Sequence, residues 1–482
     1  MFEGRHLIDG ELTLGEGGRA GDWIDSHEPA TLKPLGRVPA ATALDVDQAV
    51  QSAMRAQRDW GGLSVWERAH RLKALAAAIR ARGDEILTLE ARDTGNTIGK
   101  LRADVEIAAG YLDYFAGLGS ELKGETIPAT ARGLHYTVHE PYGVVARIVP
   151  FNHPFMFAAA HLAAPLMAGN AVVVKTPETS PLSGSVLGEL VRDTLPRGLV
   201  NIVHGQGAPA GDALVRHPLV RRIGFTGSVA TGLAIQRAAA ESAVKHVSLE
   251  LGGKNPFIVF PDADLDRVVE MAVAGMNFSW AGQSCGSTSR LLLHADVHDE
   301  IVERVAMRMR ALRLGDPLDP ASEMGPLNSS KQFERMQDFI TDANVQGARL
   351  VTGGRRPPGE AFARGYWLEP TLYADVTRSM RVVREEIFGP IVCAQRWRDE
   401  SEVVELANDS PYGLTAAVWT RDLTTGLRMT RAIESGTIWL NTAGQHFVGT
   451  PFGGWKDSGL GGEECLAELY SYSRLKAVHV PA

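Results

Sequence analysis

Cysteine is scarce in this chain of 482 residues, which contains only Cys285, Cys393 and Cys465. An odd and sparse set offers no disulfide framework and no zinc-binding spacing, and it is typical of proteins from a reducing compartment. Because neither structural use fits, one of the three thiols is a candidate for chemistry.

The chain also lacks a surplus of positive charge and a long apolar run. Its 49 basic and 57 acidic residues give a formal net charge of -8, which repels nucleic acid and anionic membranes. The most apolar stretch, 155–168, is interrupted by His161 and Pro165, and the first six residues lack the basic-then-apolar order of a secretory signal. We therefore expect a cytoplasmic protein with neither nucleic acid nor a membrane as a partner.

What the chain does contain is the composition of a globular protein, with 44% hydrophobic and 22% charged residues. Its length exceeds the size at which one hydrophobic core keeps growing, so two or three domains are expected. Apolar residues recur at helical spacing over 45–60 and 66–82, and the first hundred residues are predicted to be helical.

From residue 143 onward, short β-branched runs alternate with helical segments. The first group of expected strands is 144–149, 171–174, 200–203 and 222–225. The second group is 257–260, 391–396, 415–420 and 437–440. Strands that alternate with helices predict parallel sheets covered on both faces, and hence an α/β fold. The β-rich segments 121–140 and 470–480 lie outside both groups and are expected to pair as an arm.

Cys285 is the best nucleophile candidate of the three cysteines. It lies in a small polar loop, 282–287, where backbone N–H groups can support a thiolate. Cys393 lies in an apolar strand, as a buried small hydrophobic residue does, and Cys465 follows two glutamates, whose charge disfavours a thiolate. A single cysteine is more often structural than catalytic, so the loop does not decide the matter alone.

Three polar residues follow expected strands, where α/β sheets bind their ligands. Glu250 ends one strand and is followed by glycines. Asn152 lies between two prolines after another strand, where its amide can donate to an oxyanion. Ser228 opens a helix after a third strand, where free N–H groups can hold a phosphate. Each of the three, taken singly, also fits an ordinary turn residue.

Seven segments occur in one order along the chain. They are Pro150-Phe151-Asn152, Val174-Lys175-Thr176-Pro177-Glu178, Phe225-Thr226-Gly227-Ser228, Glu250-Leu251-Gly252-Gly253-Lys254, Gly282-Gln283-Ser284-Cys285, Glu385-Glu386-Ile387-Phe388-Gly389-Pro390 and Pro451-Phe452-Gly453-Gly454. Together, over essentially the whole chain, they resemble the aldehyde dehydrogenase superfamily in its NAD(P)-dependent, non-acylating branch. The resemblance implies oxidation of an aldehyde to a carboxylic acid through a covalent thioester.

The resemblance assigns catalytic roles residue by residue. Cys285 matches the nucleophile that attacks the aldehyde carbon. Asn152, with the backbone N–H of Cys285, would bind the oxyanion. Glu250 matches the base that activates water to hydrolyse the thioester, and Glu463 matches a second carboxylate linked to proton release.

The resemblance also implies NAD as the cofactor and no metal. Lys175 and Glu178 match the positions that hold the hydroxyls of the adenosine ribose, and a carboxylate there repels a 2'-phosphate, which favours NAD over NADP. The other implied cofactor contacts are Phe151, Thr226, Gly227, Ser228, Gly252, Glu386 and Phe388.

The domain organisation that follows has three parts. A Rossmann-like NAD-binding domain would comprise 1–120 and 141–250, and an α/β catalytic domain 251–440. The segments 121–140 and 465–482 would form a small β oligomerisation arm that adds strands to the sheet of a partner. A homodimer or homotetramer is therefore expected.

Departures from the family pattern bear on the substrate. Phe151 replaces the usual tryptophan, Ala160 stands where a tryptophan is frequent, and the loop 441–447 is small and polar. The residues expected to line the substrate tunnel are His153, Met156, Ala160, Ser284, Gly286, His446 and Phe452. A roomy, partly polar tunnel favours a bulky or aromatic aldehyde with hydroxyl groups, while its few aromatics disfavour a trimethylammonium group.

Several alternatives remain. A betaine, amino-aldehyde or semialdehyde dehydrogenase is the nearest, although Glu178 argues against the NADP-dependent semialdehyde enzymes. Transfer of the acyl group to coenzyme A is disfavoured by Glu250, since acylating relatives tend to lack that base. A crystallin-like relative without turnover is disfavoured because Cys285, Glu250, Asn152 and Lys175 are present together.

Overall fold

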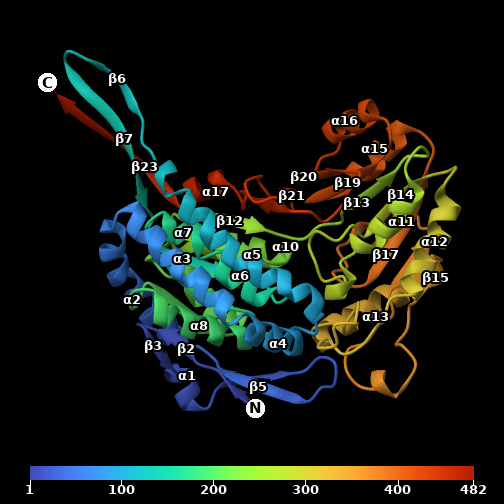
Figure 1. The fold of residues 1–482 in the computed structure, drawn as a ribbon, viewed down its shortest axis with the longest axis horizontal. Coiled ribbons are helices and arrows are strands. Elements are labelled where there is room, and N and C mark those ends of the chain that lie inside the picture. The colour runs from blue at the N-terminus through green and yellow to red at the C-terminus, as the bar shows by residue number, and fades with distance from the viewer. Residues whose placement is uncertain (482) are drawn as a thin grey trace.

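The computed structural model describes residues 1–481, with residues 129 and 130 described through their backbone alone. Two large sheets with helices packed on them form the body, and a three-stranded β arm projects from it (Figure 1). All the strands expected from the alternating pattern are present. The predicted α/β fold class is confirmed.

The first sheet has eight strands in the order β22-β12-β11-β8-β9-β10-β2-β3, with β22 (Gly459–Leu460) at one edge. Its parallel centre consists of β8 (Val144–Ile148), β9 (Ala171–Thr176), β10 (Val200–His204), β11 (Val220–Thr226) and β12 (His246–Glu250). The helices α2 (Ala43–Gly62), α8 (Leu182–Thr194) and α10 (Val229–Ser242) belong to this half of the molecule. Strands β8, β9 and β10 are buried along their whole length, as expected of a sheet covered on both faces.

The expectation of a wholly helical N-terminal region is wrong for the first forty residues. Five strands lie there: β1 (Phe2–Glu3), β2 (His6–Ile8), β3 (Glu11–Thr13), β4 (Trp23–His27) and β5 (Pro34–Pro39). Three of them have only two or three residues and are too short to show a period, and β2 also pairs with a distant strand, since Leu7 pairs with Ile202. The predicted helices follow as α2 and α3 (Val65–Ala81), each with a capping box, and then as α4 (Gly83–Thr94) and α5 (Ile98–Gly117).

The second sheet has seven strands in the order β15-β16-β17-β14-β13-β19-β20. Their bounds are β13 (Pro256–Val259), β14 (Arg290–His294), β15 (Arg349–Thr352), β16 (Thr371–Ala374), β17 (Ile391–Trp397), β19 (Thr415–Trp419) and β20 (Thr437–Leu440). Alternate side chains enter different cores. Leu291 and Leu293 of β14 pack with helices α11 (Leu265–Ala274), α12 (His298–Arg310) and α13 (Ser330–Val345), whereas Leu292 packs with α15 (Glu400–Asn408) and α16 (Leu423–Ala432). This period of two distributes the apolar residues to both faces of the sheet.

The arm joins two segments that are far apart in the sequence. Strand β7 (Gly133–Pro141) pairs antiparallel with β6 (Thr126–Thr130) and with the whole of the C-terminal strand β23 (Ser473–Pro481). Figure 1 shows these strands extending away from the body. The preceding helix α17 (Leu466–Ser471) packs against the body instead, with Leu469 in the core of the first sheet.

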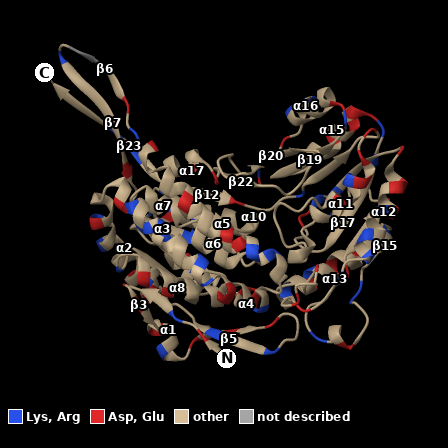
Figure 2. Ribbon diagram, in the orientation of Figure 1, with Lys and Arg blue, Asp and Glu red and all other residues tan. Residues whose placement is uncertain are grey.

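Two further observations concern the distribution of charged residues and the hydropathy of the helices. Figure 2 shows acidic and basic residues interspersed over both halves of the body, with no broad area of one sign on the face in view. Within residues 1–481, no helix is both long and apolar enough to cross a membrane.

Candidate active site

The predicted site residues of the first sheet gather at its carboxyl edge. Strand β8 ends beside Lys175 of β9, and Thr226 of β11 lies opposite Glu250 of β12. The loop that follows β8 carries Asn152 to the same edge. Open α/β sheets bind their ligands at this edge.

The second sheet meets this edge through the segments that precede its strands. The loop before β14 carries Cys285, and the segment before β17 carries Phe388. Nδ2 of Asn152 donates a hydrogen bond to the carbonyl oxygen of Gln283 at 3.0 Å. The rings of Phe151 and Phe388 meet edge to face, with centroids 5.7 Å apart. The structure therefore brings these residues together between the two sheets.

The nucleophile loop follows the short helix η3 (Phe278–Trp280) and is fixed by its backbone. Residues Ala281 and Gly282 have left-handed φ angles of 50° and 70°. A Cβ at position 282 would lie 2.3 Å from the carbonyl oxygen of Gly389, so this approach requires glycine. Nδ2 of Asn255 also donates to the carbonyl oxygen of Cys285 at 2.6 Å.

The Cys285 thiol is partly exposed, but its environment disfavours the thiolate. Loss of hydration and the nearby charges of Glu386 and Glu250 raise its pKa to about 12, against the opposing effect of the backbone N–H groups of Cys285 and Gly286. The resting thiol is therefore protonated near neutral pH, and attack requires a proton acceptor. Cys393 is buried in β17, as expected of a structural cysteine.

Asn152 is buried, and its backbone carbonyl oxygen accepts a hydrogen bond. Nδ2 of Asn96 donates to the carbonyl oxygen of Asn152 at 2.7 Å. Oδ1 of Asn152 has no hydrogen-bond partner among the described residues. The amide therefore lies next to the nucleophile loop and donates a hydrogen bond to it.

Glu250 is the last residue of β12 and is buried. Neither of its carboxylate oxygens has a hydrogen-bond partner within the described part of the chain. Burial, followed by the charges of Glu463 and Glu468, raises the pKa of Glu250 well above its ordinary value. An acid with a raised pKa takes up and releases protons closer to neutral pH, which suits a general base.

Glu463 lies in a buried group of ionisable residues beside Glu250. Nη2 of Arg147 donates to Oε1 of Glu463 at 3.0 Å, and Nε2 of His161 is 3.5 Å from Oε2. A backbone bridge pairs residue 463 with Phe452. Glu463 is also near enough to the predicted base for its charge to raise the pKa of Glu250.

The predicted cofactor residues Lys175 and Thr226 lie at the ends of β9 and β11, the two strands that flank β8. Lys175 is buried and its Nζ is 3.1 Å from Oε2 of the more exposed Glu178. Thr226 is buried with its hydroxyl unpartnered among the described residues. Ser228 caps α10 by accepting a hydrogen bond from the backbone N–H of Thr231, which leaves other N–H groups at this helix start for an anion.

Glu386 lies against the glycines after Glu250. The backbone N–H of Gly253 donates to Oε1 of Glu386 at 3.1 Å. A Cβ at Gly252 would lie 2.1 Å from Oε2 of the same carboxylate, so the approach depends on glycine. Burial raises the pKa of Glu386 to about 7.

The residues predicted for the substrate tunnel have different environments. Nδ1 of His153 is 2.7 Å from Oδ2 of Asp104, and its ring packs against Trp280 with centroids 4.7 Å apart. His446 pairs with Glu464 at 2.9 Å and contacts the ring of Phe452.

The other predicted tunnel residues range from partly exposed to buried. Met156 and Ser284 are partly exposed. Gly286 is buried, and Ala160 is buried within the core of the first sheet. The tunnel thus remains a prediction, with His153 and His446 as its best-defined polar members.

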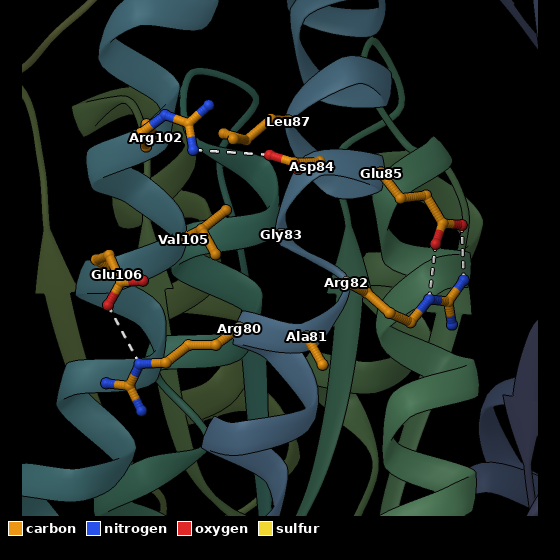
Figure 3. Close-up of a pocket in the computed structure, with 10 residues that line it drawn as sticks. All are labelled: Arg80, Ala81, Arg82, Gly83, Asp84, Glu85, Leu87, Arg102, Val105 and Glu106. Carbon is orange, nitrogen blue, oxygen red and sulfur yellow. Dashed lines mark hydrogen bonds and ion pairs between the residues drawn. The ribbon is translucent and has the colours of Figure 1, made fainter.

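A surface hollow of about 370 Å³ lies elsewhere, between α3, α4 and α5 (Figure 3). Its charged residues are paired with one another: Arg80 with Glu106, Arg82 with Glu85 and Arg102 with Asp84. The lining contains none of the predicted site residues. With its charges neutralised internally, the hollow offers no chemistry comparable to that around Cys285.

Comparison with known proteins agrees with this geometry. Residues 17–478 match the profile of the aldehyde dehydrogenase family. The chain belongs to this family. The predicted resemblance is confirmed.

Individual relatives align with this aldehyde dehydrogenase over nearly its whole length. Aldehyde dehydrogenase tropH of Talaromyces stipitatus is 46% identical over 463 residues, which cover 95% of this chain and 90% of the relative. The NAD+ complex of an aldehyde dehydrogenase from Bacillus cereus has a TM-score of 0.95 at 36% identity, covering 100% of this chain and 97% of that one. PnpE from Pseudomonas sp. WBC-3 has a TM-score of 0.96 at 38% identity, with coverages of 100% and 98%.

Some residues that shape the site of this aldehyde dehydrogenase were not identified from the sequence. Asn96 and Asn255 hold the backbones of Asn152 and Cys285, and neither stands out, because an asparagine near a turn is common. Arg147 did carry a signal. A charged residue in a strand expected to be buried on both faces requires a specific partner.

Proposed function

We propose that this aldehyde dehydrogenase oxidises its substrate with NAD, through a covalent bond to Cys285 and hydrolysis assisted by Glu250. The observation that carries the proposal is that the buried carboxylate of Glu250, which has no hydrogen-bond partner among the described residues, is close enough to the Cys285 thiol for its charge to raise the pKa of that thiol. Asn152 supports it, since its amide already contacts the nucleophile loop.

The chemistry follows from the roles of these side chains. Cys285 gives its proton to solvent water, and its sulfur forms a bond to the aldehyde carbon as the electron pair of the carbonyl double bond moves to the oxygen. The amide of Asn152 and the backbone N–H of Cys285 hold the oxyanion. When bound, NAD supplies the acceptor for the hydride that this carbon loses. Glu250 then takes a proton from water as the water oxygen adds to the thioester carbon, and the carbon–sulfur bond breaks to release the acid.

The residues present fit NAD. Thr226 offers a buried hydroxyl without a partner in the described part of the chain, next to the start of the 14-residue helix α10. Lys175 and Glu178 place a donor and an acceptor within 3.1 Å of each other, as two neighbouring ribose hydroxyls require. The structures of the Bacillus cereus enzyme and of PnpE with nicotinamide adenine dinucleotide lend further support.

Glu178→Gln is expected to improve the use of NADP. The neutral amide no longer repels a 2'-phosphate, so the NADP to NAD ratio of kcat/KM should rise by about five- to tenfold, a modest effect because this side chain is half exposed. Steady-state kinetics with both cofactors measure this ratio. Glu189→Gln, which removes a partly exposed, ion-paired carboxylate from α8, is the matched control. An unchanged ratio in the Glu178 variant would show that this carboxylate does not select the cofactor.

We further propose a bulky or aromatic aldehyde as the substrate. The support is the polar character that His153 and His446 bring to the predicted tunnel, each beside a carboxylate. A trimethylammonium substrate would be served better by a cage of aromatic rings, and Phe452 is the one aromatic ring in contact with His446 among the ring pairs described.

The domain division expected from the sequence is proposed on the basis of the sheets. Residues 1–120 and 141–250 would bind NAD, 251–440 would carry the nucleophile, and 121–140 with 465–482 would serve oligomerisation. The projecting strands expose Ile127, Leu134 and Leu475, and an exposed strand edge with apolar side chains favours pairing with another chain. A homodimer or homotetramer is therefore proposed.

The direct test follows the absorbance of the reduced cofactor. NAD and NADP are each supplied with aliphatic, amino, betaine and hydroxylated aromatic aldehydes. We expect reduction of NAD, fastest with aromatic aldehydes. Faster turnover of betaine aldehyde than of benzaldehydes would refute the substrate proposal, and activity that appears only with coenzyme A would refute the role of Glu250 in hydrolysis.

A further inference from the structure

The turn between α4 and α5 lies where the two halves of the body meet (Figure 1). Gly95 in this turn has a left-handed φ of 84°, and a Cβ on it would lie 2.8 Å from Cγ of Pro326. The backbone N–H of Ile98 donates to the carbonyl oxygen of Pro317 at 2.8 Å. The turn is therefore packed against the second half, and its glycine permits the close approach.

Two consecutive residues of this turn bind the two loops of the candidate active site. Nδ2 of Asn96 donates to the carbonyl oxygen of Asn152 at 2.7 Å. The backbone N–H of Thr97 donates to the carbonyl oxygen of Ser279 at 3.1 Å, and Ser279 belongs to η3, just before the nucleophile loop. One short segment thus holds the loop of the proposed oxyanion donor and the loop of the proposed nucleophile.

Asn96 is itself fixed to the end of α4. It is only 2% exposed. Its backbone N–H donates to Oγ1 of Thr94 at 3.1 Å, and the hydroxyl of Thr94 donates to the carbonyl oxygen of Glu90 at 2.6 Å. The amide of Asn96 therefore reaches the Asn152 carbonyl from an anchored turn.

The carbonyl oxygen of Asn152 depends on this amide. Among the described residues, Asn96 is its one hydrogen-bond donor, and Pro154, two residues further on, has no N–H to offer. A buried carbonyl without a donor costs free energy, so without the Asn96 amide the backbone at residue 152 is expected to shift. That backbone determines where the side-chain amide of Asn152 points.

The side chain of Asn152 completes the link to the nucleophile loop. Its Nδ2 donates to the carbonyl oxygen of Gln283 at 3.0 Å, and Gln283 lies two residues before Cys285. A shift of the Asn152 backbone would therefore move the amide that lies beside this loop. A misplacement of about 1 Å in a catalytic group can slow a reaction by about a hundredfold.

We propose that Asn96 is a positioning residue for attack on the aldehyde, which holds the amide of Asn152 where that amide donates to the oxyanion. The inference rests on the proposed function. In this step the Cys285 sulfur bonds to the aldehyde carbon, the electron pair of the carbonyl double bond moves to the oxygen, and the Asn152 amide donates to that oxygen. Because Asn96 acts through Asn152, its effect is confined to steps in which an oxyanion forms.

Two reactions of Cys285 test this role, because only one of them forms an oxyanion. With p-nitrophenyl acetate, the sulfur adds to the carbonyl carbon, and the oxyanion collapses to release p-nitrophenolate in a burst. With iodoacetamide, the sulfur displaces iodide from a saturated carbon. In Asn96→Ala we expect the rate constant of the burst to fall by about ten- to thirtyfold, while the rate constant of alkylation stays within about twofold of the wild-type value.

A double-mutant cycle tests whether Asn96 acts through Asn152. Asn152→Ala removes the amide and should slow the burst by about a hundredfold. Adding Asn96→Ala to this variant should slow the burst by no more than about a further twofold, because the amide that Asn96 positions is already gone. A purely structural role of Asn96 would instead give the same loss with and without the Asn152 amide.

Two further variants separate the effect from damage to the fold. Asn96→Leu keeps nearly the same side-chain volume without a donor, and it should reproduce the loss even if Asn96→Ala does not fold. Asn201→Ala removes another buried asparagine, whose Nδ2 donates to the carbonyl oxygen of Gly198 at 2.7 Å near the amino end of β10, and it should leave the burst unchanged. Thermal unfolding shows which variants are folded.

Three results would each overturn the role of Asn96. They are a folded Asn96→Ala or Asn96→Leu with the wild-type burst, an alkylation rate that falls as far as the burst, and equal losses in the two backgrounds of the cycle. Absence of a Cys285-dependent burst in the wild-type protein would instead overturn the proposed function itself.

Discussion

Replacing Cys285 with alanine is expected to abolish aldehyde oxidation, with kcat reduced by roughly three orders of magnitude or more. The reason is that no other described thiol is accessible to substrate: Cys393 and Cys465 are both buried. Cofactor reduction with the best aldehyde of the panel measures the loss. Binding of NAD, followed by protein fluorescence, should persist, because the cofactor residues lie on other strands.

The matched control is Cys393→Ala. Its sulfur lies 3.5 Å from the carbonyl oxygen of Val382 inside the second core, so the substitution should lower the free energy of unfolding by about 1 kcal/mol while leaving kcat near the wild-type value. If Cys285→Ala retained activity within tenfold of wild type, Cys285 would not be the nucleophile.

Replacing Glu250 with glutamine should separate the two halves of the reaction. Attack by Cys285 and loss of hydride would still occur, so mixing with aldehyde and NAD should give one reduced cofactor per active site. Turnover after this burst should fall by about 10²- to 10⁴-fold, the usual contribution of a general base. Rapid-mixing absorbance records both phases, and mass spectrometry of the stalled protein should find the acyl group on Cys285.

The pH dependence of the hydrolysis rate provides a second test of the role of Glu250. Glu250 acts as a base only when deprotonated, and burial raises its pKa well above the ordinary value. Hydrolysis by the wild-type protein should therefore accelerate as the pH rises through that pKa, whereas residual hydrolysis by the glutamine variant should lack this rise. If Glu250→Gln turned over slowly and showed no burst of cofactor reduction, Glu250 would instead act in a step before thioester hydrolysis.

Much of the fold was predictable because its signals are local. The β-branched runs at 144–149 and 171–174 lie between segments of helical period, and each became a strand of a parallel sheet. The end of a strand is also a local feature, which is why Glu250 could be placed at the ligand edge before its partners were known. Ser228 is likewise recognisable as a helix cap from its own segment.

What could not be predicted depends on contacts between distant segments. The N-terminal strands are stabilised by pairing such as that of Leu7 with Ile202, which leaves no periodic trace in three residues. The partner of Arg147 lies 316 residues away, at Glu463. A charged residue in a strand predicted to be buried indicates that an oppositely charged or hydrogen-bonding partner exists, but only the folded structure identifies that partner.

The raised pKa of the Cys285 thiol has a consequence for the lifetime of the protein. Peroxides and electrophiles react with the thiolate and hardly with the thiol. We therefore expect Cys285, whose pKa is raised to about 12, to react slowly with oxidants while the enzyme is idle. The loss of hydration that raises this pKa should thus slow reaction with oxidants as well as attack on the substrate.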